Sequence, residues 1–139
     1  MIGGIEPATS FMVQSMQNGK HVISANKAAI AANYKLLTET ARANNVEFLF
    51  EASVAGGIPV LTALTGALQA NNFIEIMGIL NGTTNYILTK MVQENLSFDD
   101  ALRIAQELGY AETKDPSDDV DGRDACRKIA ILSSLVCCH

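Results

Sequence analysis

The segment from Glu112 to Lys128 concentrates the side chains of this 139-residue chain that could do chemistry. Its carboxylates belong to Glu112, Asp115, Asp118, Asp119, Asp121 and Asp124. Asp124 and Lys128 are four residues apart and would share one face of a helix. The apolar run after Lys128 predicts that this helix continues into a buried region. A lysine there, beside carboxylates, suits a proton donor or acceptor, although a solvated acidic loop is the alternative interpretation.

Two asparagines stand where a helix is expected to begin. After Asn81, the backbone of Gly82 and Thr83 could face an anionic group such as a carboxylate, or it could form a plain turn and helix cap. Asn26 and Lys27 follow the run HVISA, an expected strand, and ligands of parallel sheets bind at the carboxyl ends of strands. An exposed first-turn lysine is the plain interpretation, but a helix dipole disfavours a cation at this end, which adds some support to a functional lysine.

The glycine-rich loop around Gly56 and Gly57 follows a second expected strand. It is neither a G-x-G-x-x-G dinucleotide motif nor a phosphate-binding loop ending in G-K-S/T. A structural turn is one interpretation, because glycine serves backbone with positive φ. The other is that its carbonyls, beside the carboxylate of Glu51, hold a hard cation through oxygen ligands.

Apolar periodicity and capping residues predict the elements that position these segments. Helices are expected over residues 8–18, 27–44, 60–70, 84–94, 97–109 and 124–136. Strands are expected over residues 21–25, 46–50 and 73–80, with an acidic loop over 112–122. Strand, helix and strand before Pro59 are typical of a parallel α/β layer, whereas several helices dominate after it. We therefore predict two domains, residues 1–58 and 59–139.

Composition predicts a packed, acidic protein. The chain is 48% hydrophobic and 18% charged, and its net charge is -5. An acidic chain argues against nucleic-acid or anionic-membrane partners, and no apolar run reaches the roughly 20 residues of a membrane span. The N-terminus lacks a signal-peptide pattern, so we expect a cytoplasmic protein. Cys126, Cys137 and Cys138 lack metal-ligand spacing even with His139 beside them, and predict reduced thiols.

Four segments together resemble the homoserine dehydrogenase family, in its order and at compatible spacings, over essentially the whole chain. They are GKHVISANKAAIA, FEASVAGGIPV, GILNGTTNYILTKM, and AQELGYAE followed by DPSDDVDGRDACRKIAIL. The resemblance implies an α/β fold: the C-terminal part of a Rossmann-like nucleotide-binding domain, then part of an α+β substrate and dimerisation domain. It also implies the interconversion of L-aspartate 4-semialdehyde and L-homoserine with NADP or NAD, a step of threonine, methionine and isoleucine biosynthesis.

The resemblance further implies roles for individual residues. The acid/base residue of the reaction corresponds to Lys128. The pocket for the amino-acid substrate corresponds to Glu112, which would bind the amino group, and to Asp119, Asp124, Gly82 and Thr83. The residues near the cofactor correspond to Gly3, Gly4, Ser24 and Lys27. A sodium site seen in the family corresponds to Glu51 with the carbonyls of Val54, Gly56 and Ile58.

Two departures from the family pattern limit these assignments. The family usually reads E-x-D-P, whereas the run from Glu112 to Pro116 is one residue longer, so the placement of Glu112 against Lys128 is open. The G-x-G-x-x-G turn would lie before Met1, and the family continues past His139. We therefore expect the isolated chain to be inactive and poorly soluble or oligomeric, and the full-length protein to be a homo-oligomer acting on small molecules. The alternatives are a non-catalytic binding or dimerisation remnant and a nicotinamide-dependent dehydrogenase for another amino acid.

Overall fold

The computed structural model describes residues 2–137, which pack as two compact units. The first unit holds the residues up to Ile76 and those from Arg127 onward, and the second unit is Met77–Cys126. None of the helices in residues 2–137 combines the length and the apolar run that a membrane span requires. The units are described one at a time below.

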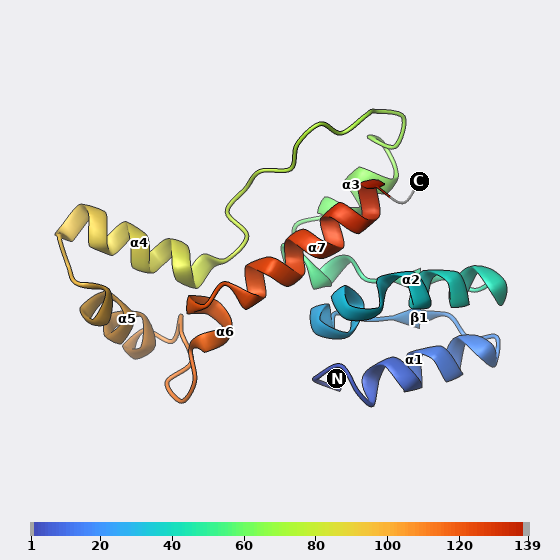
Figure 1. Cartoon of the computed structure of the whole chain (residues 1–139), viewed down its shortest axis with the longest axis horizontal. Helices are drawn as coiled ribbons and strands as arrows, with labels where there is room; N and C mark the ends of the chain where they lie inside the picture. Colours follow the sequence, from blue (N-terminus) through green and yellow to red (C-terminus); the bar gives the residue numbers. More distant parts are fainter. Residues whose placement is uncertain (1, 138–139) are drawn as a thin grey trace. The chain divides into compact units, whose positions relative to one another are not determined.

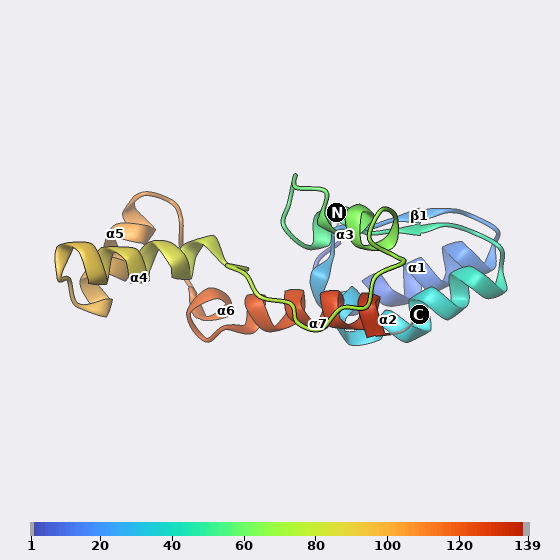
Figure 2. The same cartoon turned by 90° about the horizontal axis from the view of Figure 1, so that it is seen from above.

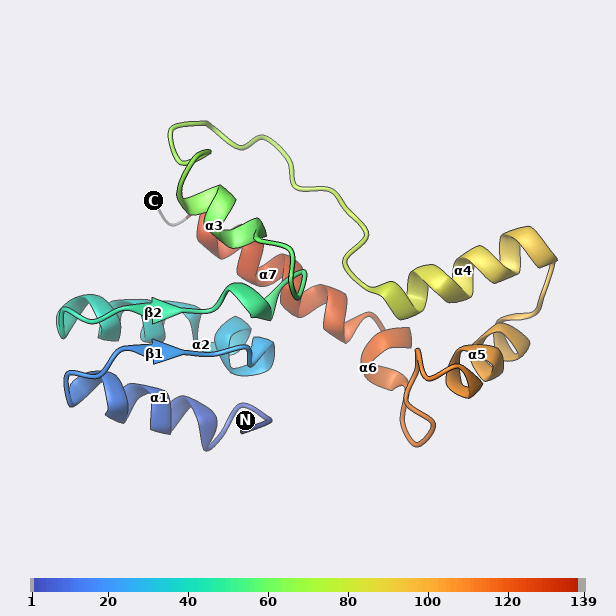
Figure 3. The same ribbon diagram turned by 180° about the vertical axis from the view of Figure 1, so that it is seen from behind.

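A strand–helix–strand layer opens the first unit (Figures 1 and 3). Its elements are α1 (Ala8–Gln17), β1 (Val22–Ile23), α2 (Lys27–Ala43) and β2 (Phe48–Leu49). The two strands are parallel neighbours, as the sequence pattern predicts. Both helices lie on one face of this small sheet and pack against each other (Figure 2).

The apolar stripe of α2 forms the core of this layer. Ile30, Leu37 and Ala41 are buried, as their helical spacing predicts, and Met16 of α1 is buried with them. Asn26 is the predicted N-cap, because its side chain accepts a hydrogen bond from the Ala29 N–H at 3.0 Å.

Two further helices contribute to the first unit. A short 3-10 turn, η1 (Glu51–Ser53), leads to α3 (Val60–Thr65), which ends five residues earlier than predicted. Gly66 ends it because its backbone leaves the helical region (φ -107°, ψ -97°). Helix α7 (Arg123–Cys137) covers the predicted 124–136, but only Ile131, Leu132 and Leu135 of its first-unit part are buried. The helix therefore enters a buried region on one face only, because Ser133 and Cys137 on the other face are exposed.

The second unit is built from three helices around a small core. They are α4 (Gly82–Glu94), α5 (Phe98–Glu107) and α6 (Ser117–Val120). Helix α5 begins at the predicted cap, where the Ser97 hydroxyl accepts from the Asp100 N–H at 3.1 Å, and it ends before Gly109, whose φ is +77°. The core consists of Ile87, Ala101, Ala105 and Ala111. Helix α6 interrupts the segment 112–122, which was predicted to be a loop throughout.

The strand predicted over residues 73–80 is absent. This segment runs as irregular extended chain between α3 and α4 (Figure 1), and Ile74, Met77 and Ile79 are 100%, 82% and 75% exposed. A strand needs a neighbour to pair its backbone groups, and the only sheet in residues 2–137 is the β1–β2 pair. An apolar, β-rich composition was therefore insufficient to make this segment a strand.

Candidate functional site

A polar network in the second unit is centred on Asn81, the residue before α4. Its side-chain oxygen accepts from the Thr84 N–H at 2.7 Å and so caps the helix. Its side-chain N–H groups donate to Asp119 Oδ1 at 2.7 Å and to Asp124 Oδ2 at 2.9 Å. Asn81 and Asp124 are both buried. The network thus joins the start of α4 to α6 and to the start of α7.

Two threonine hydroxyls strengthen this junction. Thr83 Oγ1 donates to the Tyr110 carbonyl at 2.7 Å, and Thr84 Oγ1 donates to the Asp119 carbonyl at 3.2 Å. Gly82, at the first position of α4, lies between the two anchored residues. The structure therefore gathers Gly82, Thr83, Asp119 and Asp124, which the sequence analysis assigned to one substrate pocket.

A cavity of about 290 Å³ lies beside the network. Its polar lining includes Asn81, Thr84 and Asp119, and its apolar lining includes Leu88 and Val120. This volume is near the lower end of the range for small-molecule pockets, which suits a ligand the size of an amino acid.

Two more residues were predicted to act on the substrate, Glu112 and Lys128. Glu112 lies in the exposed segment between α5 and α6, and its backbone carbonyl accepts from Gln106 Nε2 at 2.9 Å. In the same segment, hydrogen bonds from the Ser117 side chain and amide lower the pKa of Asp115 below its usual value. Lys128 is half-buried on α7, one helical turn after Asp124.

A second polar cluster stands at the carboxyl end of β1 in the first unit. Asn26 Nδ2 donates to the carbonyls of Ile2 and Gly4 at 3.0 and 2.7 Å, and the Asn26 N–H donates to Ser24 Oγ at 3.2 Å. Lys27 follows as the first residue of α2. This cluster brings the predicted cofactor residues Gly3, Gly4, Ser24 and Lys27 to one strand end, which is where ligands of parallel sheets bind.

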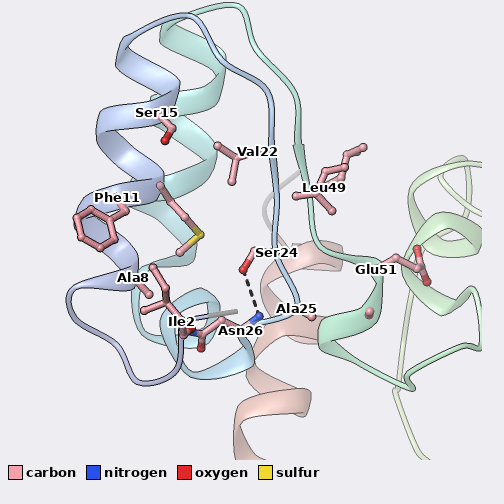
Figure 4. A pocket seen from close by; sticks show the side chains of 13 residues that line it. Ile2, Ala8, Phe11, Ser15, Val22, Ser24, Ala25, Asn26, Leu49 and Glu51 are labelled. Atoms are coloured by element: carbon pink, nitrogen blue, oxygen red, sulfur yellow. Dashed lines mark hydrogen bonds between the residues drawn. The ribbon is translucent and has the colours of Figure 1, made fainter.

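A larger cavity of about 730 Å³ adjoins this strand end (Figure 4). Side chains of α1 and β1, among them Phe11 and Val22, give it a mainly apolar lining. Ser24, Asn26 and Glu51 contribute polar groups to it. An apolar cavity with a few polar groups can hold the planar ring of a cofactor.

The carboxylate of Glu51 caps α3. It accepts from the Leu61 N–H at 2.8 Å, from the Thr62 N–H at 2.7 Å and from Thr62 Oγ1 at 2.6 Å. Partial burial opposes its ionisation, but hydrogen bonds from the Thr62 side chain and from backbone amides outweigh burial and lower the pKa of Glu51. The Glu51 carboxylate is thus engaged by donors of α3, and the Glu51 carbonyl accepts from the Val54 N–H at 3.3 Å. No group of three His, Cys, Asp or Glu side chains that could hold a metal occurs within residues 2–137.

The loop after Glu51 contains the other predicted cation ligands, Val54, Gly56 and Ile58. Ala55 and Gly56 have φ of +61° and +58°, so two successive residues are left-handed and reverse the chain. The cysteines predicted to be reduced are consistent with the structure where it describes them, since Cys126 and Cys137 are free. Cys138 and His139 lie outside the described residues.

The sequence analysis missed the donor role of both asparagines. It identified Asn26 only as the start of a helix and Asn81 only as part of a turn and helix cap. Each also donates two hydrogen bonds to groups more than twenty residues away in sequence. A capping asparagine next to expected pocket residues was the available signal, but capping alone is also met by serine, threonine or aspartate.

A parallel strand–helix–strand layer with polar groups at a strand end is typical of nucleotide-binding α/β proteins. Comparison with family models identifies a particular family within this class. Residues 59–139, more than half of the chain, match the family model "Homoserine dehydrogenase", and residues 2–51 match "Homoserine dehydrogenase, NAD binding domain". The chain therefore belongs to the homoserine dehydrogenase family.

Individual relatives support the same assignment. The chain is 51% identical to the homoserine dehydrogenase of Synechocystis sp. over 135 residues, which are 97% of this chain and 31% of that protein. The homoserine dehydrogenase of Bacillus subtilis is 46% identical over the same shares. The chain thus spans about 31% of the length of these curated relatives.

Solved structures agree in fold. A homoserine dehydrogenase from Thiobacillus denitrificans superimposes with a TM-score of 0.92 at 47% identity, over 97% of this chain and 31% of that one. A hyperthermophilic archaeal homoserine dehydrogenase in complex with NADPH gives a TM-score of 0.88 at 36% identity, over 93% and 40%. The α/β fold class with a nucleotide-binding part is thereby confirmed.

Proposed function

We propose that this chain carries the substrate-binding and proton-transfer residues of an enzyme that interconverts L-aspartate 4-semialdehyde and L-homoserine. The observation that carries the proposal is the Asn81 network. It gathers Gly82, Thr83, Asp119 and Asp124, all of which the family resemblance assigns to the amino-acid pocket. The proposal is supported further by the similarity to homoserine dehydrogenases over 97% of the chain.

The proposed roles follow from charge and position. The carboxylates of Asp119 and Asp124, together with the exposed carboxylate of Glu112, bind the ammonium group of the amino acid, because carboxylates form charge-assisted hydrogen bonds with an ammonium group. The backbone of Gly82 and Thr83 begins α4, where free N–H groups and the helix dipole favour the substrate carboxylate.

Lys128 is the proposed acid/base residue. In the direction of homoserine oxidation, the neutral amine of Lys128 takes the proton of the substrate hydroxyl as the hydride leaves the same carbon. In reduction, the Lys128 ammonium returns that proton to the carbonyl oxygen, so atoms and charge balance in both directions. The bound NADP or NAD accepts or supplies the hydride.

The cofactor is proposed to meet the first unit at the carboxyl end of β1. Gly3, Gly4 and Ser24 would approach it through small groups, and Lys27 would contribute a positive charge beside it. This fit is supported by the apolar cavity that adjoins the strand end and by the match of residues 2–51 to an NAD-binding family model. The chain contains no G-x-G-x-x-G turn to hold the pyrophosphate, so we propose that it does not turn over alone.

A sodium ion is proposed for the loop after η1, held by Glu51 together with the carbonyls of Val54, Gly56 and Ile58. The support is the reversal at Ala55 and Gly56 and the oxygen chemistry that hard cations prefer. Titrating the chain with sodium chloride against choline chloride at equal ionic strength tests it. Amide shifts confined to this loop with sodium alone are expected, and equal shifts with both salts would contradict the site.

We propose that the boundary between a nucleotide-binding domain and a substrate domain lies between residues 58 and 59. The complete enzyme is proposed to be a cytoplasmic homo-oligomer. Size-exclusion chromatography with light scattering on a full-length enzyme that carries this segment tests the oligomer, and a monomer would contradict it.

The functional test uses a hybrid enzyme, in which this chain replaces the matching segment of the Synechocystis homoserine dehydrogenase. We expect homoserine-dependent reduction of NADP+ by this hybrid. Lys128→Ala should lower kcat by about a hundredfold or more, which is typical of a lost acid/base group. Lys114→Ala is the matched control, because Lys114 is an exposed lysine in a nearby loop, and it should leave kcat unchanged. Equal rates in the two variants would contradict the role of Lys128.

A further inference from the structure

The side chain of Asn81 makes contacts that helix capping does not require. A cap needs only an acceptor for a backbone N–H, and Asn81 supplies it to Thr84. Because that N–H can only donate, the oxygen of the amide must face Thr84, and its NH2 group must face the two carboxylates. One proton is therefore available for Asp119 and the other for Asp124, at 2.7 and 2.9 Å.

The burial of this arrangement explains why a neutral donor stands there. Asp124 is only 3% exposed and Asn81 only 9%. The bonded oxygens of Asp119 and Asp124 lie within two hydrogen-bond lengths of each other, so their charges repel. The Asn81 amide stabilises both ionised groups without cancelling their charge.

We propose that Asn81 is a positioning residue, which holds Asp119 and Asp124 at a fixed spacing as a paired receptor for the cationic amino group of the substrate. This inference rests on the proposed function, because it takes the pair to belong to the amino-acid pocket. The cavity of about 290 Å³ that Asn81 and Asp119 line provides space for such a group. Asn81 acts only through the two carboxylates.

Other charged groups lie on the elements around this pair. Asp121 and Arg123, next to α6, form an ion pair at 2.9 Å and are about half exposed. Lys90 and Glu94 on α4 pair with each other. Asp118 precedes Asp119 on α6, and Arg127 and Lys128 follow Asp124 on α7. These groups set the electrostatic background, which every variant below leaves unchanged.

Three variants separate positioning from capping. Asn81→Ser keeps an acceptor for the Thr84 N–H but is too short to bridge both carboxylates. Asn81→Asp keeps the size and the capping oxygen, and it replaces the donor with a third carboxylate. Ser97→Ala is the matched control, because it removes the cap of α5 in the same unit and touches neither Asp119 nor Asp124.

The first measurement is a carboxyl 13C NMR titration of the complete 139-residue chain. We expect the titration midpoints of Asp119 and Asp124 to rise in Asn81→Ser, to rise further in Asn81→Asp, and to stay unchanged in Ser97→Ala. If Asn81→Asp does not fold, Asn81→Ser decides the question. Wild-type midpoints in Asn81→Ser would overturn the proposal, whatever reaction the chain serves.

The second measurement is the steady-state kinetics of the hybrid enzyme. Asn81→Ser should raise KM for homoserine about tenfold, as expected for weakened charge-assisted hydrogen bonds, while KM for NADP+ and kcat change little. A purely structural role would instead lower kcat through the folded fraction and leave KM unchanged, and this result would overturn the proposal. An inactive unmutated hybrid would contradict the proposed function, and the carboxyl titration would still decide the role of Asn81.

Discussion

Asn26 and Asn81 hold equivalent places in the two units. Each is the N-cap of a long helix, and each side-chain oxygen accepts from a backbone N–H three residues on, at Ala29 and Thr84 respectively. The capping hydrogen bond is thus the same in both cases, although the backbone differs, with φ and ψ of -80° and 85° at Asn26 and of -131° and 116° at Asn81. The difference lies in what the amide nitrogen of each residue binds.

Asn26 donates to the backbone carbonyls of Ile2 and Gly4, which are neutral. The second asparagine donates to Asp119 and Asp124, which are charged. The first arrangement fixes a chain segment beside a strand end, whereas the second joins two carboxylates from α6 and α7. The comparison shows that the chemistry of the distant partner decides whether a capping residue serves architecture alone or also a site.

The two units also differ in the size of the side chains that their cores bury. The first unit buries large side chains such as Met16, Ile30 and Leu37. In the second unit, Ile87 and three alanines are fully buried, and larger side chains such as Met91 and Leu102 pack against them while only partly buried. Because fewer large side chains are fully buried there, we infer that polar contacts such as those of Asn81 contribute a larger share of the stability of the second unit.

The largest expected loss of stability comes from truncating one large buried side chain in the core of either unit. Ile30→Ala and Ile87→Ala should each cost about 2–5 kcal/mol, because both side chains are fully buried. Native-state hydrogen exchange should show lost protection in α1 and α2 for the first variant, and in α4 and α5 for the second. Equal loss of protection throughout residues 2–137 in both variants would show that the units do not hold separate cores.

The second prediction sets Asn81→Asp against Asn26→Asp. Both keep the helix cap and remove two donated hydrogen bonds, so each should cost about 1–3 kcal/mol near neutral pH. Asn81→Asp also creates three adjacent carboxylates, which raises their pKa values in the folded state. Its destabilisation should therefore be complete above the raised pKa values and be relieved as pH falls toward about 4, the unfolded value.

Urea unfolding between pH 7 and pH 4 measures this difference. The free energy of unfolding of Asn81→Asp should approach that of the wild type at the acidic end. The cost of Asn26→Asp should change less with pH, because its side chain meets carbonyls and forms no carboxylate cluster. The same pH dependence in both variants would contradict the distinction between the two asparagines.

The third prediction concerns Glu51, whose dependence on pH has the opposite sign. Its pKa is lowered in the folded state, so its capping of α3 stabilises above the unfolded value of about 4.3 and is lost as pH falls through the lowered pKa. Glu51→Gln should cost about 1 kcal/mol at pH 7, the usual magnitude for a helix cap. Its difference from the wild type should disappear in urea unfolding near pH 3, and a difference that persists there would contradict this explanation.

The smallest effects are expected from exposed ion pairs on the two units. Lys35 and Glu39 lie 3.8 Å apart on α2, and Arg103 and Glu107 lie 2.7 Å apart on α5. Lys35→Ala and Arg103→Ala should each change stability by no more than about 0.5 kcal/mol. Thermal melts in low and high salt measure this, and a loss above about 1 kcal/mol in either unit would contradict the prediction, because it would equal the effect of a helix cap.

Local rules predicted most of the helices. The stripe of α2 follows from the spacing of Ile30, Leu37 and Ala41, and its start follows from Asn26. The strand over 73–80 was wrong because composition does not supply a pairing partner, and the short α6 was missed inside an acidic segment. The early end of α3 depends on the backbone conformation of Gly66, which apolar periodicity does not predict.

The candidate site was less predictable from local rules than the helices. Asn81 reaches carboxylates 38 and 43 residues away in sequence, and no periodicity indicates such a contact. Only the resemblance to homoserine dehydrogenases placed Asp119 and Asp124 in one pocket. Neither the pattern nor the resemblance identified the amide that joins them, because a turn residue and a bridging residue have the same local appearance.

The most direct test of the account is the amino-acid dependence of NADP+ reduction by the unmutated hybrid enzyme. We predict reduction with L-homoserine at a rate of the same order as that of the parent Synechocystis enzyme, and little with L-serine or L-threonine. A folded hybrid that reduces no NADP+ would contradict the account and favour a non-catalytic binding module. A clear preference for another amino acid would contradict it in favour of a different dehydrogenase.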